Sequence, residues 1–255
     1  MTRPLFFGPV EAVRGAAPGS AFLLGGDEGR HAAVVRRLAP GERIDVSDGS
    51  GYRIGGVITA VGTGSVELEV ETVGQDPAPR HRLVLVQALA KGGRDEQAVE
   101  SATELGVDAV VPWHAERSIV RWRGDKADKG RQKWVSLVGA AAKQSRRSFV
   151  PEVNGVMDTT RLAAWSKAVD QMVILHEDAG ETLAQRFAAL EASGALDAPS
   201  STAVVVGPEG GISDAELAKL GAVGALPARL GPHVLRSSSA GPAALVLLNH
   251  LLGRW

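Results

Sequence analysis

Apolar and polar positions follow two different periodicities along this chain. In the C-terminal two thirds, short apolar, β-branched runs alternate with segments in which apolar side chains recur at helical spacing. The apolar runs predict buried strands at residues 83–89, 108–111, 172–175 and 203–206. Helices are expected between them, at residues 95–105, 129–145 and 181–191. A strand, a helix and a second strand within roughly thirty residues form a βαβ unit, which predicts an α/β domain with a parallel sheet.

The N-terminal third predicts mainly short strands instead. Its apolar runs lie at residues 44–46, 52–58 and 66–73 and are separated by turns rich in Gly, Asp and Ser. Asp48-Gly49-Ser50-Gly51 is a hairpin signal, and a helix is expected near Glu28–Leu38. Short strands at this spacing are typical of a small β-barrel. The proline-containing segment Gly74–Pro79 marks a boundary, which predicts two domains, residues 1–77 and 78–255.

The most informative stretch, Ala203–Leu248, contains two glycine-rich breaks, each directly after a predicted strand. The first is Gly207-Pro208-Glu209-Gly210-Gly211, and the second, Gly231-Pro232, follows a short strand at residues 225–230. Adjacent glycines permit positive φ angles and let a ligand approach the backbone closely, so a side chain added at Gly210 should fill ligand space. Open α/β sheets place their ligands at the carboxyl ends of the strands, and both breaks lie there.

Helix signals follow both breaks. Ser213 and Glu216 have the spacing of a capping box, and Ile212 and Leu217 that of a hydrophobic staple, which predicts a helix starting at Ser213. A last apolar helix is expected at residues 240–252, with its proline in the first turn, where proline is tolerated. The order strand, glycine-rich turn and capped helix favours a ligand site over an ordinary connection.

Composition limits the class of protein. The chain has 255 residues, no cysteine, 44% apolar and 22% charged residues, and a formal net charge of −1. These values are those of a globular protein, and the lack of cysteine excludes disulfides and thiolate metal sites. The first residues lack the apolar core of a signal peptide, and no apolar run approaches the ~20 residues of a membrane span. We therefore expect a cytoplasmic protein with no membrane partner.

Several common motifs are missing from the sequence. No GxGxxG follows the first strand of the C-terminal part, which disfavours a nicotinamide site. There is no GxxxxGK[ST] loop for a nucleoside triphosphate, no HxxxH pair for a metal, and no GxSxG elbow for a serine nucleophile. No metal is expected.

Basic residues concentrate in one part of a chain that is not basic as a whole. Residues 117–147 contain ten Lys or Arg against two Asp, with Trp122 and Trp134 among them. Such a run is either the solvated face of a helix or a surface that contacts the phosphates of a nucleic acid. The segment Lys143–Arg147 ends the run and gives an RNA contact the same weight as a solvated helix face.

Several of these motifs together resemble a known family. GPEGGISDAEL and LGPHVLRSSSA look like the SPOUT methyltransferases, and TELGV, ERS and the N-terminal RPLFF narrow the resemblance. The chain resembles the ribosomal RNA small subunit methyltransferase E family, the 16S rRNA uracil-N3 methyltransferases. The resemblance implies S-adenosyl-L-methionine as cofactor, a C-terminal domain with a deep trefoil knot, an N-terminal PUA-like RNA-binding barrel, and a homodimer. It also implies 16S rRNA, in the small ribosomal subunit, as the substrate.

The resemblance also assigns candidate residues. Arg236 is the candidate catalytic residue, because an arginine beside the uracil oxygens would stabilise the anion left after N3 loses its proton. The cofactor-binding candidates lie at three strand ends: Leu175, His176, Glu177, Gly207, Pro208, Glu209, Gly210, Gly211, Leu230, Gly231, Leu235 and Ser238. The RNA-binding candidates are Arg3, His31, Arg36, Arg117, Arg121, Lys143, Arg146 and Arg147.

The sequence departs from the family at one informative point. Family members often have LRTETA where this chain has LRSSSA, so Ser238 replaces a carboxylate, and a general base cannot be assigned there. Two other functions stay open: a SPOUT enzyme that methylates another RNA, and a non-catalytic RNA-binding protein with a degenerate cofactor pocket.

Overall fold

A computed structural model describes residues 3–255 of the chain. The chain forms two compact units rather than two consecutive halves. One unit contains the described residues up to Ala78 together with Ala142–Val150, and the other contains Pro79–Ala141 and Pro151–Trp255. A single boundary near residue 78 therefore does not describe both units, because residues 142–150 also belong to the N-terminal unit.

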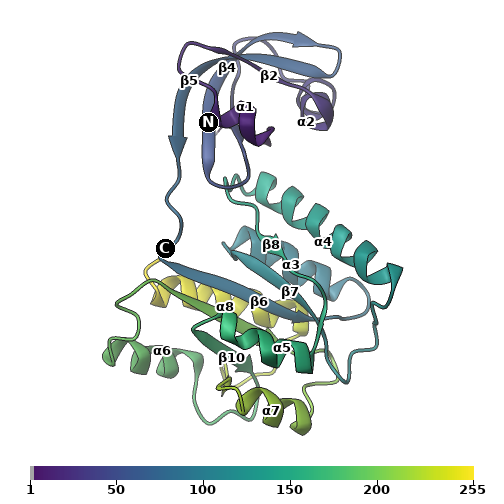
Figure 1. Cartoon of the computed structure of the whole chain (residues 1–255), viewed down its shortest axis with the longest axis vertical. Helices are drawn as coiled ribbons and strands as arrows, with labels where there is room; N and C mark the ends of the chain where they lie inside the picture. Colours follow the sequence, from purple (N-terminus) through teal and green to yellow (C-terminus); the bar gives the residue numbers. More distant parts are fainter. Residues whose placement is uncertain (1–2) are drawn as a thin grey trace. The chain divides into compact units, whose positions relative to one another are not determined.

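The larger unit is built on a parallel sheet (Figure 1). Its strands are β6 (His81–Ala88), β7 (Ala109–His114), β8 (Glu152–Val153), β9 (Met157–Asp158), β10 (Gln171–Leu175), β11 (Ser200–Val206) and β12 (Leu226–Ala228). They lie in the order β12-β10-β11-β6-β7-β8, with β9 also paired to β7, and every pairing is parallel. The parallel α/β sheet expected from the βαβ pattern is confirmed.

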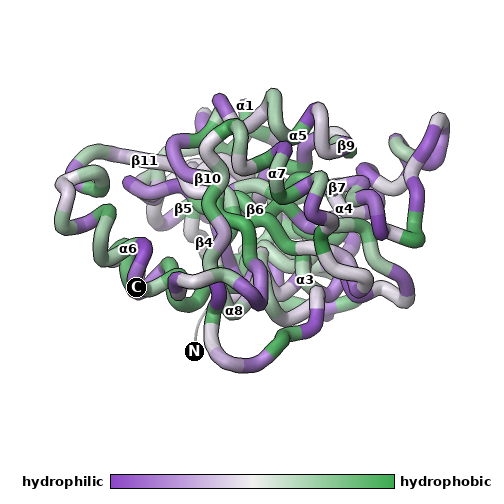
Figure 2. The backbone as a smooth tube through the Cα atoms, turned by 90° about the horizontal axis from the view of Figure 1, so that it is seen from below, coloured by the Kyte–Doolittle hydropathy of each residue, from purple (hydrophilic) through white to green (hydrophobic). Residues whose placement is uncertain are grey.

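Helices cover both faces of this sheet. The helices are α3 (Arg94–Glu104), α5 (Thr159–Trp165), α6 (Leu183–Ala192), α7 (Asp214–Gly221) and α8 (Ser237–Leu251), with a short 3₁₀ turn at Ser166–Ala168. Helix α4 (Asp125–Gln144) belongs to this unit up to Ala141. Val84 and Val86 of β6 share a buried cluster with residues of α5 and α7. The alternate residue Leu85 faces Gly241 of α8, where an added Cβ would lie 2.8 Å from the Leu85 Cδ1 atom. Because both faces are covered, β6 is apolar at consecutive positions, and its hydrophobic residues stand out in Figure 2.

The last helix begins earlier than the sequence predicts. Helix α8 starts at Ser237, so Pro242 lies in its second turn rather than in its first. Proline has no N–H to donate to the carbonyl four residues before it, here that of Ser238. The expectation of a first-turn proline is therefore wrong, because the helix starts three residues before the expected residue 240. The helix still packs firmly, because its small and apolar residues Gly241, Ala244 and Leu245 are buried.

The smaller unit contains a five-stranded sheet, β1 (Leu5–Phe7), β2 (Ala21–Leu24), β3 (Arg43–Ser47), β4 (Tyr52–Gly62) and β5 (Ser65–Gln75). Its order is β1-β3-β4-β5-β2, so the edge strands β1 and β2 do not pair with each other in the described chain. The small barrel expected from the sequence is a half-barrel sheet, whose edge strands β1 and β2 have only three and four residues. The helix expected at 28–38 is split into α2 (Gly26–Arg30) and a π-helical turn at His31–Val35, and α1 (Val10–Arg14) precedes β2.

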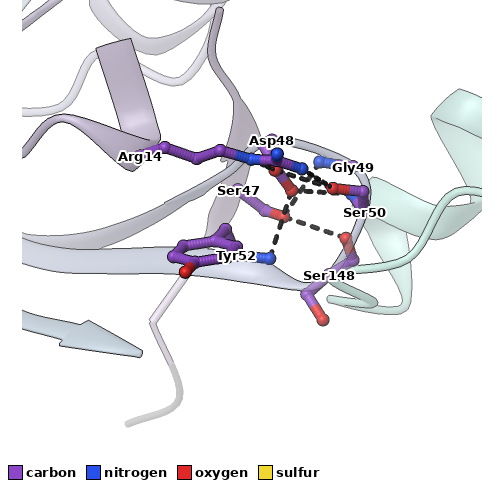
Figure 3. Close-up of polar contacts among 7 residues, drawn as sticks. All are labelled: Arg14, Ser47, Asp48, Gly49, Ser50, Tyr52 and Ser148. Carbon is purple, nitrogen blue, oxygen red and sulfur yellow. Dashed lines mark hydrogen bonds and ion pairs between the residues drawn. The ribbon is translucent and has the colours of Figure 1, made fainter. Parts of the chain in front are cut away.

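The returning residues 142–150, called here the basic segment, bind the loop between β3 and β4. The Ser47 Oγ atom donates a hydrogen bond to the Ser148 carbonyl over 2.9 Å (Figure 3). The Val150 amide donates to the Gly49 carbonyl over 2.9 Å. Gly51 has a φ of +101° and lies against the Phe149 ring, so the loop has no room for a side chain there. These contacts attach the basic segment to the smaller unit.

A polar cluster fixes the same loop. Arg14 donates hydrogen bonds to the Asp48 carboxylate (2.9 Å) and to the Ser50 hydroxyl (2.8 Å), as Figure 3 shows. Burial raises the pKa of Asp48, but hydrogen bonds from Ser50, Arg14 and the Tyr52 amide outweigh it and leave that pKa below its ordinary value. The Asp48-Gly49-Ser50-Gly51 turn expected from the sequence is confirmed, and it also holds a distant part of the chain.

Within residues 3–255, no helix is both long and apolar enough to cross a membrane.

Candidate active site

The α/β unit has a cavity at the carboxyl ends of its strands. It has a volume of 390 Å³, within the range of small-molecule sites. The cavity lies where β10 and β11 end and beside the chain that connects β12 to α8. Its walls are formed by Arg94, Leu175, His176, Glu177, Val206, Gly207, Pro208, Glu209, Gly211, Ile212, Val234, Leu235, Arg236, Ser237 and Ala240. The convergence of strand ends expected from the sequence produces this hollow.

Residues 207–211, called here the glycine loop, form one wall. The Gly211 amide donates to the Pro208 carbonyl over 2.9 Å, which closes a tight turn. Gly211 has a φ of +74°, a conformation that side chains other than glycine rarely adopt. At Gly207 a Cβ atom would lie 2.6 Å from the Ile212 Cγ1 atom, so a side chain there would displace the loop. The glycines thus meet steric requirements at two positions.

Helix α7 starts as the sequence predicts. The Ser213 Oγ atom accepts the Glu216 amide and the Glu216 carboxylate accepts the Ser213 amide, each over 3.3 Å, so the capping box is confirmed. Ile212 is buried in the cluster beneath the sheet, and Leu217 packs against the same cluster. The end of the glycine loop is therefore held both by hydrogen bonds and by apolar packing.

Charged groups of both signs line the cavity. Arg94 and Glu209 form an ion pair with 3.0 Å between Nη1 and Oε1, and Glu177 and Arg236 also face the hollow. Ser237 is buried, and its Oγ atom has no hydrogen-bond partner. A ligand that carries both an ammonium or sulfonium and a carboxylate would find partners of each sign here.

The structure places most, but not all, of the expected cofactor residues at this cavity. Leu230 and Gly231 instead line a smaller hollow of 70 Å³, which shares Leu175, His176 and Glu177 with the large one. Ser238 lines neither hollow: it is buried in the first turn of α8, and Ser237 faces the cavity in its place.

Gly210 does not line the cavity either. A Cβ atom there would lie 3.1 Å from the Cβ of Arg117, on the side of the loop away from the hollow. A side chain at Gly210 would therefore meet Arg117 rather than enter the hollow, because the turn directs this residue outward. Its neighbours Glu209 and Gly211 face the cavity instead.

Comparison with known proteins identifies the family. An RNA methyltransferase domain matches residues 76–249, and an RNA methyltransferase PUA domain matches residues 24–71. The ribosomal RNA small subunit methyltransferase E of Mycobacterium bovis is 41% identical over 93% of this chain and 89% of its own length. The chain belongs to the ribosomal RNA small subunit methyltransferase E family. The Bacillus subtilis member is 30% identical, and the match covers 90% of each chain.

A solved member of the family has the same fold. The crystal structure of the Neisseria gonorrhoeae ribosomal RNA small subunit methyltransferase E, bound to S-adenosyl methionine, matches with a TM-score of 0.81. The match covers 98% of both chains at 25% identity. The resemblance inferred from the sequence motifs is thus confirmed for the family, and this protein is an RNA methyltransferase.

Two RNA-binding candidates lie in the α/β unit of the methyltransferase and make internal hydrogen bonds. Arg117 donates to the Gly210 carbonyl over 3.0 Å. Arg121 donates to the carbonyls of Ala115 (3.0 Å) and Glu116 (2.7 Å). Arg121 therefore stabilises the turn at residues 115–121, and Arg117 links this turn to the glycine loop.

The same segment depends on a neutral histidine. The His114 Nε2 atom accepts the Trp122 amide over 2.6 Å, which requires an unprotonated nitrogen. Burial, together with the positive charges of Arg121 and Arg123, lowers the pKa of His114 below its ordinary value of 6.5. The hydrogen bond and the low pKa both favour the neutral ring.

The other six RNA-binding candidates belong to the smaller unit. Arg3 makes ion pairs with Asp45 and Glu71, and Lys143 pairs with Glu28 over 2.7 Å. The His31 ring packs edge-on against the Phe6 ring. The side chains of Arg36 and Arg146 are exposed, whereas Arg147 is half-buried. Arg146 has a φ of +60°, which is uncommon outside glycine.

Some features of the site could not be expected from sequence patterns. Arg94 faces the cavity although it begins helix α3, and only its position after two glycines, in the connection that follows β6, could have indicated it. Ser237, which lines the cavity, directly precedes Ser238, the serine that the sequence suggested for this position. Within residues 3–255, no group of three or more His, Asp or Glu side chains could hold a metal ion.

Proposed function

We propose that this methyltransferase transfers a methyl group from S-adenosyl-L-methionine to N3 of a uridine in 16S rRNA of the small ribosomal subunit. The cavity at the strand ends is the observation that carries the proposal. It combines a glycine loop, an apolar floor and charges of both signs, and it lies in a chain of the ribosomal RNA small subunit methyltransferase E family. Ligands of open α/β sheets bind at this edge.

The residues of the cavity fit the cofactor. S-adenosyl-L-methionine would supply an electrophilic methyl group on a positively charged sulfur. The carboxylates of Glu177 and Glu209 would face positive charge, and the buried Ser237 hydroxyl would gain the partner that it lacks in the protein. The backbone of the glycine loop and the apolar Leu175, Ile212 and Leu235 would enclose the rest of the molecule.

Arg236 is the proposed catalytic residue. The uracil N3 must give its proton to solvent or a base before it attacks the methyl group, and the negative charge then spreads over the neighbouring carbonyl oxygens. The N3–methyl bond would form as the methyl–sulfur bond breaks, and the cofactor would leave as a neutral thioether. Arg236 lines the cavity and would stabilise that charge electrostatically. Arg94, held by Glu209, provides a second positive charge in the same hollow.

RNA binding is proposed for both units. The exposed Arg36 and Arg146 of the smaller unit would contact phosphates, together with Arg3, His31, Lys143 and Arg147. Arg117 and Arg121 would do so from the α/β unit. The smaller unit matches the PUA domain of RNA methyltransferases, which supports this role.

We further propose that the C-terminal chain forms the deep trefoil knot of SPOUT enzymes. After the edge strand β12, the chain returns so that α8 packs against α3 and the central strands β6 and β11. Such a return is what a knotted C-terminus requires.

The proposed active form is a cytoplasmic homodimer. Val246 of α8 is 42% exposed, and Val234, beside the cavity, is 76% exposed, so both could meet a second copy. Leu248 is fully buried in its own chain, which makes it unsuitable for testing the interface. Val246→Glu should convert a dimer to a monomer in light scattering across a dilution series, whereas an unchanged mass would contradict this interface.

The decisive experiment uses small ribosomal subunits from a strain that lacks the enzyme. The purified protein and labelled S-adenosyl-L-methionine are added, and the methylated base is mapped by mass spectrometry. Methylation at N3 of one 16S uridine is expected. Methylation of another RNA would indicate a different substrate, and cofactor binding without methylation would indicate a non-catalytic RNA-binding protein.

A further inference from the structure

Glu216 is a buried carboxylate whose contacts exceed those of a helix cap. It is only 5% exposed and accepts hydrogen bonds on both oxygens. Its Oε2 atom accepts the Ser213 amide, which completes the capping box. Its Oε1 atom accepts the Glu116 amide over 2.8 Å and the Thr159 hydroxyl over 2.6 Å. Neither of these two contacts is needed to cap α7.

The three donors come from separate parts of the chain. Ser213 begins α7, Glu116 lies just after β7, and Thr159 begins α5. Thr159 in turn accepts the indole N–H of Trp113 over 3.2 Å, and the Ser213 hydroxyl also donates to the Glu116 carboxylate. A carboxylate is stable in a buried place when such neutral donors compensate for the water it has lost. Glu216 thus forms hydrogen bonds with three separate segments of the chain.

One of these segments touches the back of the glycine loop. The residue after Glu116 is Arg117, whose Nη1 atom donates to the Gly210 carbonyl over 3.0 Å. The nearest atom to a Cβ built at Gly210 is the Cβ of Arg117, at 3.1 Å. Arg117 therefore fills the space behind Gly210, while Glu209 and Gly211 on either side face the cavity.

We propose that Glu216 is a positioning residue for the cofactor site. By holding the Glu116 amide it places Arg117 against Gly210, and by holding Ser213 it fixes the other end of the glycine loop. The loop is thereby set in its binding conformation before the ligand arrives, which lowers the entropy lost on binding. This inference rests on the proposed function, because the ligand concerned is S-adenosyl-L-methionine.

The test measures cofactor affinity by calorimetry in Glu216→Gln. The substitution keeps the size of the side chain but places an N–H₂ group among N–H and O–H donors, so at least one hydrogen bond is lost. The dissociation constant and the KM for S-adenosyl-L-methionine should rise about tenfold, equivalent to about 1.4 kcal/mol. The kcat at saturating cofactor should change less than about threefold, because the lost interaction stabilises the bound ground state and the transition state equally.

A double-mutant cycle separates positioning from capping. If Glu216 acts through Arg117, the Glu216→Gln/Arg117→Ala double variant loses no more affinity than the more affected single variant. Additive losses would overturn the proposed link. Should Glu216→Gln fail to fold, Thr159→Val takes its place in the cycle, since it removes one donor and leaves the capping box intact.

Asp214→Asn is the matched control. It removes a carboxylate from the same first turn of α7, but Asp214 is exposed, so affinity should not change. A merely structural Glu216 would lower the melting temperature of the variant while leaving the dissociation constant at its wild-type value, and this result would overturn the inference. Failure of the wild-type protein to bind the cofactor in the same titration would instead refute the proposed function.

Discussion

The glycine loop and the basic segment are both irregular stretches in which the proposed functional groups lie, yet they are held in different ways. The C-terminal end of the glycine loop is fixed by residues adjacent to it in sequence, through the capping box and the packing of Ile212, and Arg117 supports only its back. The basic segment is fixed by the loop between β3 and β4, about a hundred residues away in sequence. Local contacts can be inferred from motifs, whereas distant contacts require the fold.

The largest expected effect tests the glycine loop. Gly211→Val places a β-branched side chain at a φ of +74°, which costs about 3 kcal/mol and so should weaken S-adenosyl-L-methionine binding ~100-fold. Calorimetry measures the loss. Gly139→Ala is the control: it lies in α4 with open space around its Cβ, so cofactor affinity should remain unchanged. Unaltered affinity in Gly211→Val would mean that the loop is an ordinary turn.

The second prediction tests the attachment of the basic segment. Gly51→Val forces a side chain against the Phe149 ring at a φ of +101°, so residues 148–150 should leave the loop. RNA binding should weaken about tenfold, because loss of one or two phosphate contacts is worth roughly 1–2 kcal/mol. Cofactor affinity should be unaffected. Equal losses of both affinities would show that the two regions are not independent.

The sequence allowed the local parts of the site to be predicted. The capping box of Ser213 and Glu216, the turn at 48–51 and the buried parallel strands each depend on neighbouring residues, and all three are confirmed. The outward direction of Gly210 depends on Arg117, far away in the chain, and the sequence suggested the opposite. The open half-barrel was missed because its edge strands are too short to give a periodic signal.

The third prediction concerns a single arginine of the basic segment. Arg146→Gly removes a charge and also relieves a left-handed backbone conformation, which costs about 1–2 kcal/mol outside glycine. Stability should stay constant or rise, while RNA affinity falls a few-fold and the log–log salt slope decreases by roughly 0.7–0.9. Filter binding at several salt concentrations measures the slope. An unchanged salt slope would mean that Arg146 makes no phosphate contact.

The smallest expected effect is a pH dependence near the back of the glycine loop. The pKa of His114 is lowered in the folded protein, so below the ordinary value of 6.5 the unfolded chain binds more protons. The free energy of unfolding should therefore fall as pH drops from 6.5 through the folded pKa. In His114→Asn, the change of unfolding free energy with pH should become smaller, by an amount equivalent to less than one proton taken up on unfolding. Denaturant titrations at several pH values measure it. The part that remains is due to His81, because burial lowers the pKa of this histidine too.

The return of the basic segment to the smaller unit has a consequence for synthesis on the ribosome. The first segment of the smaller unit ends at Ala78, but the unit is complete only when Ser148–Val150 reach the loop at Ser47–Gly51. About seventy more residues must be translated first, which takes roughly 4–14 s at 5–20 residues per second. During that interval the nascent smaller unit lacks one of its own segments, so its final folding step is timed by the synthesis of the other unit.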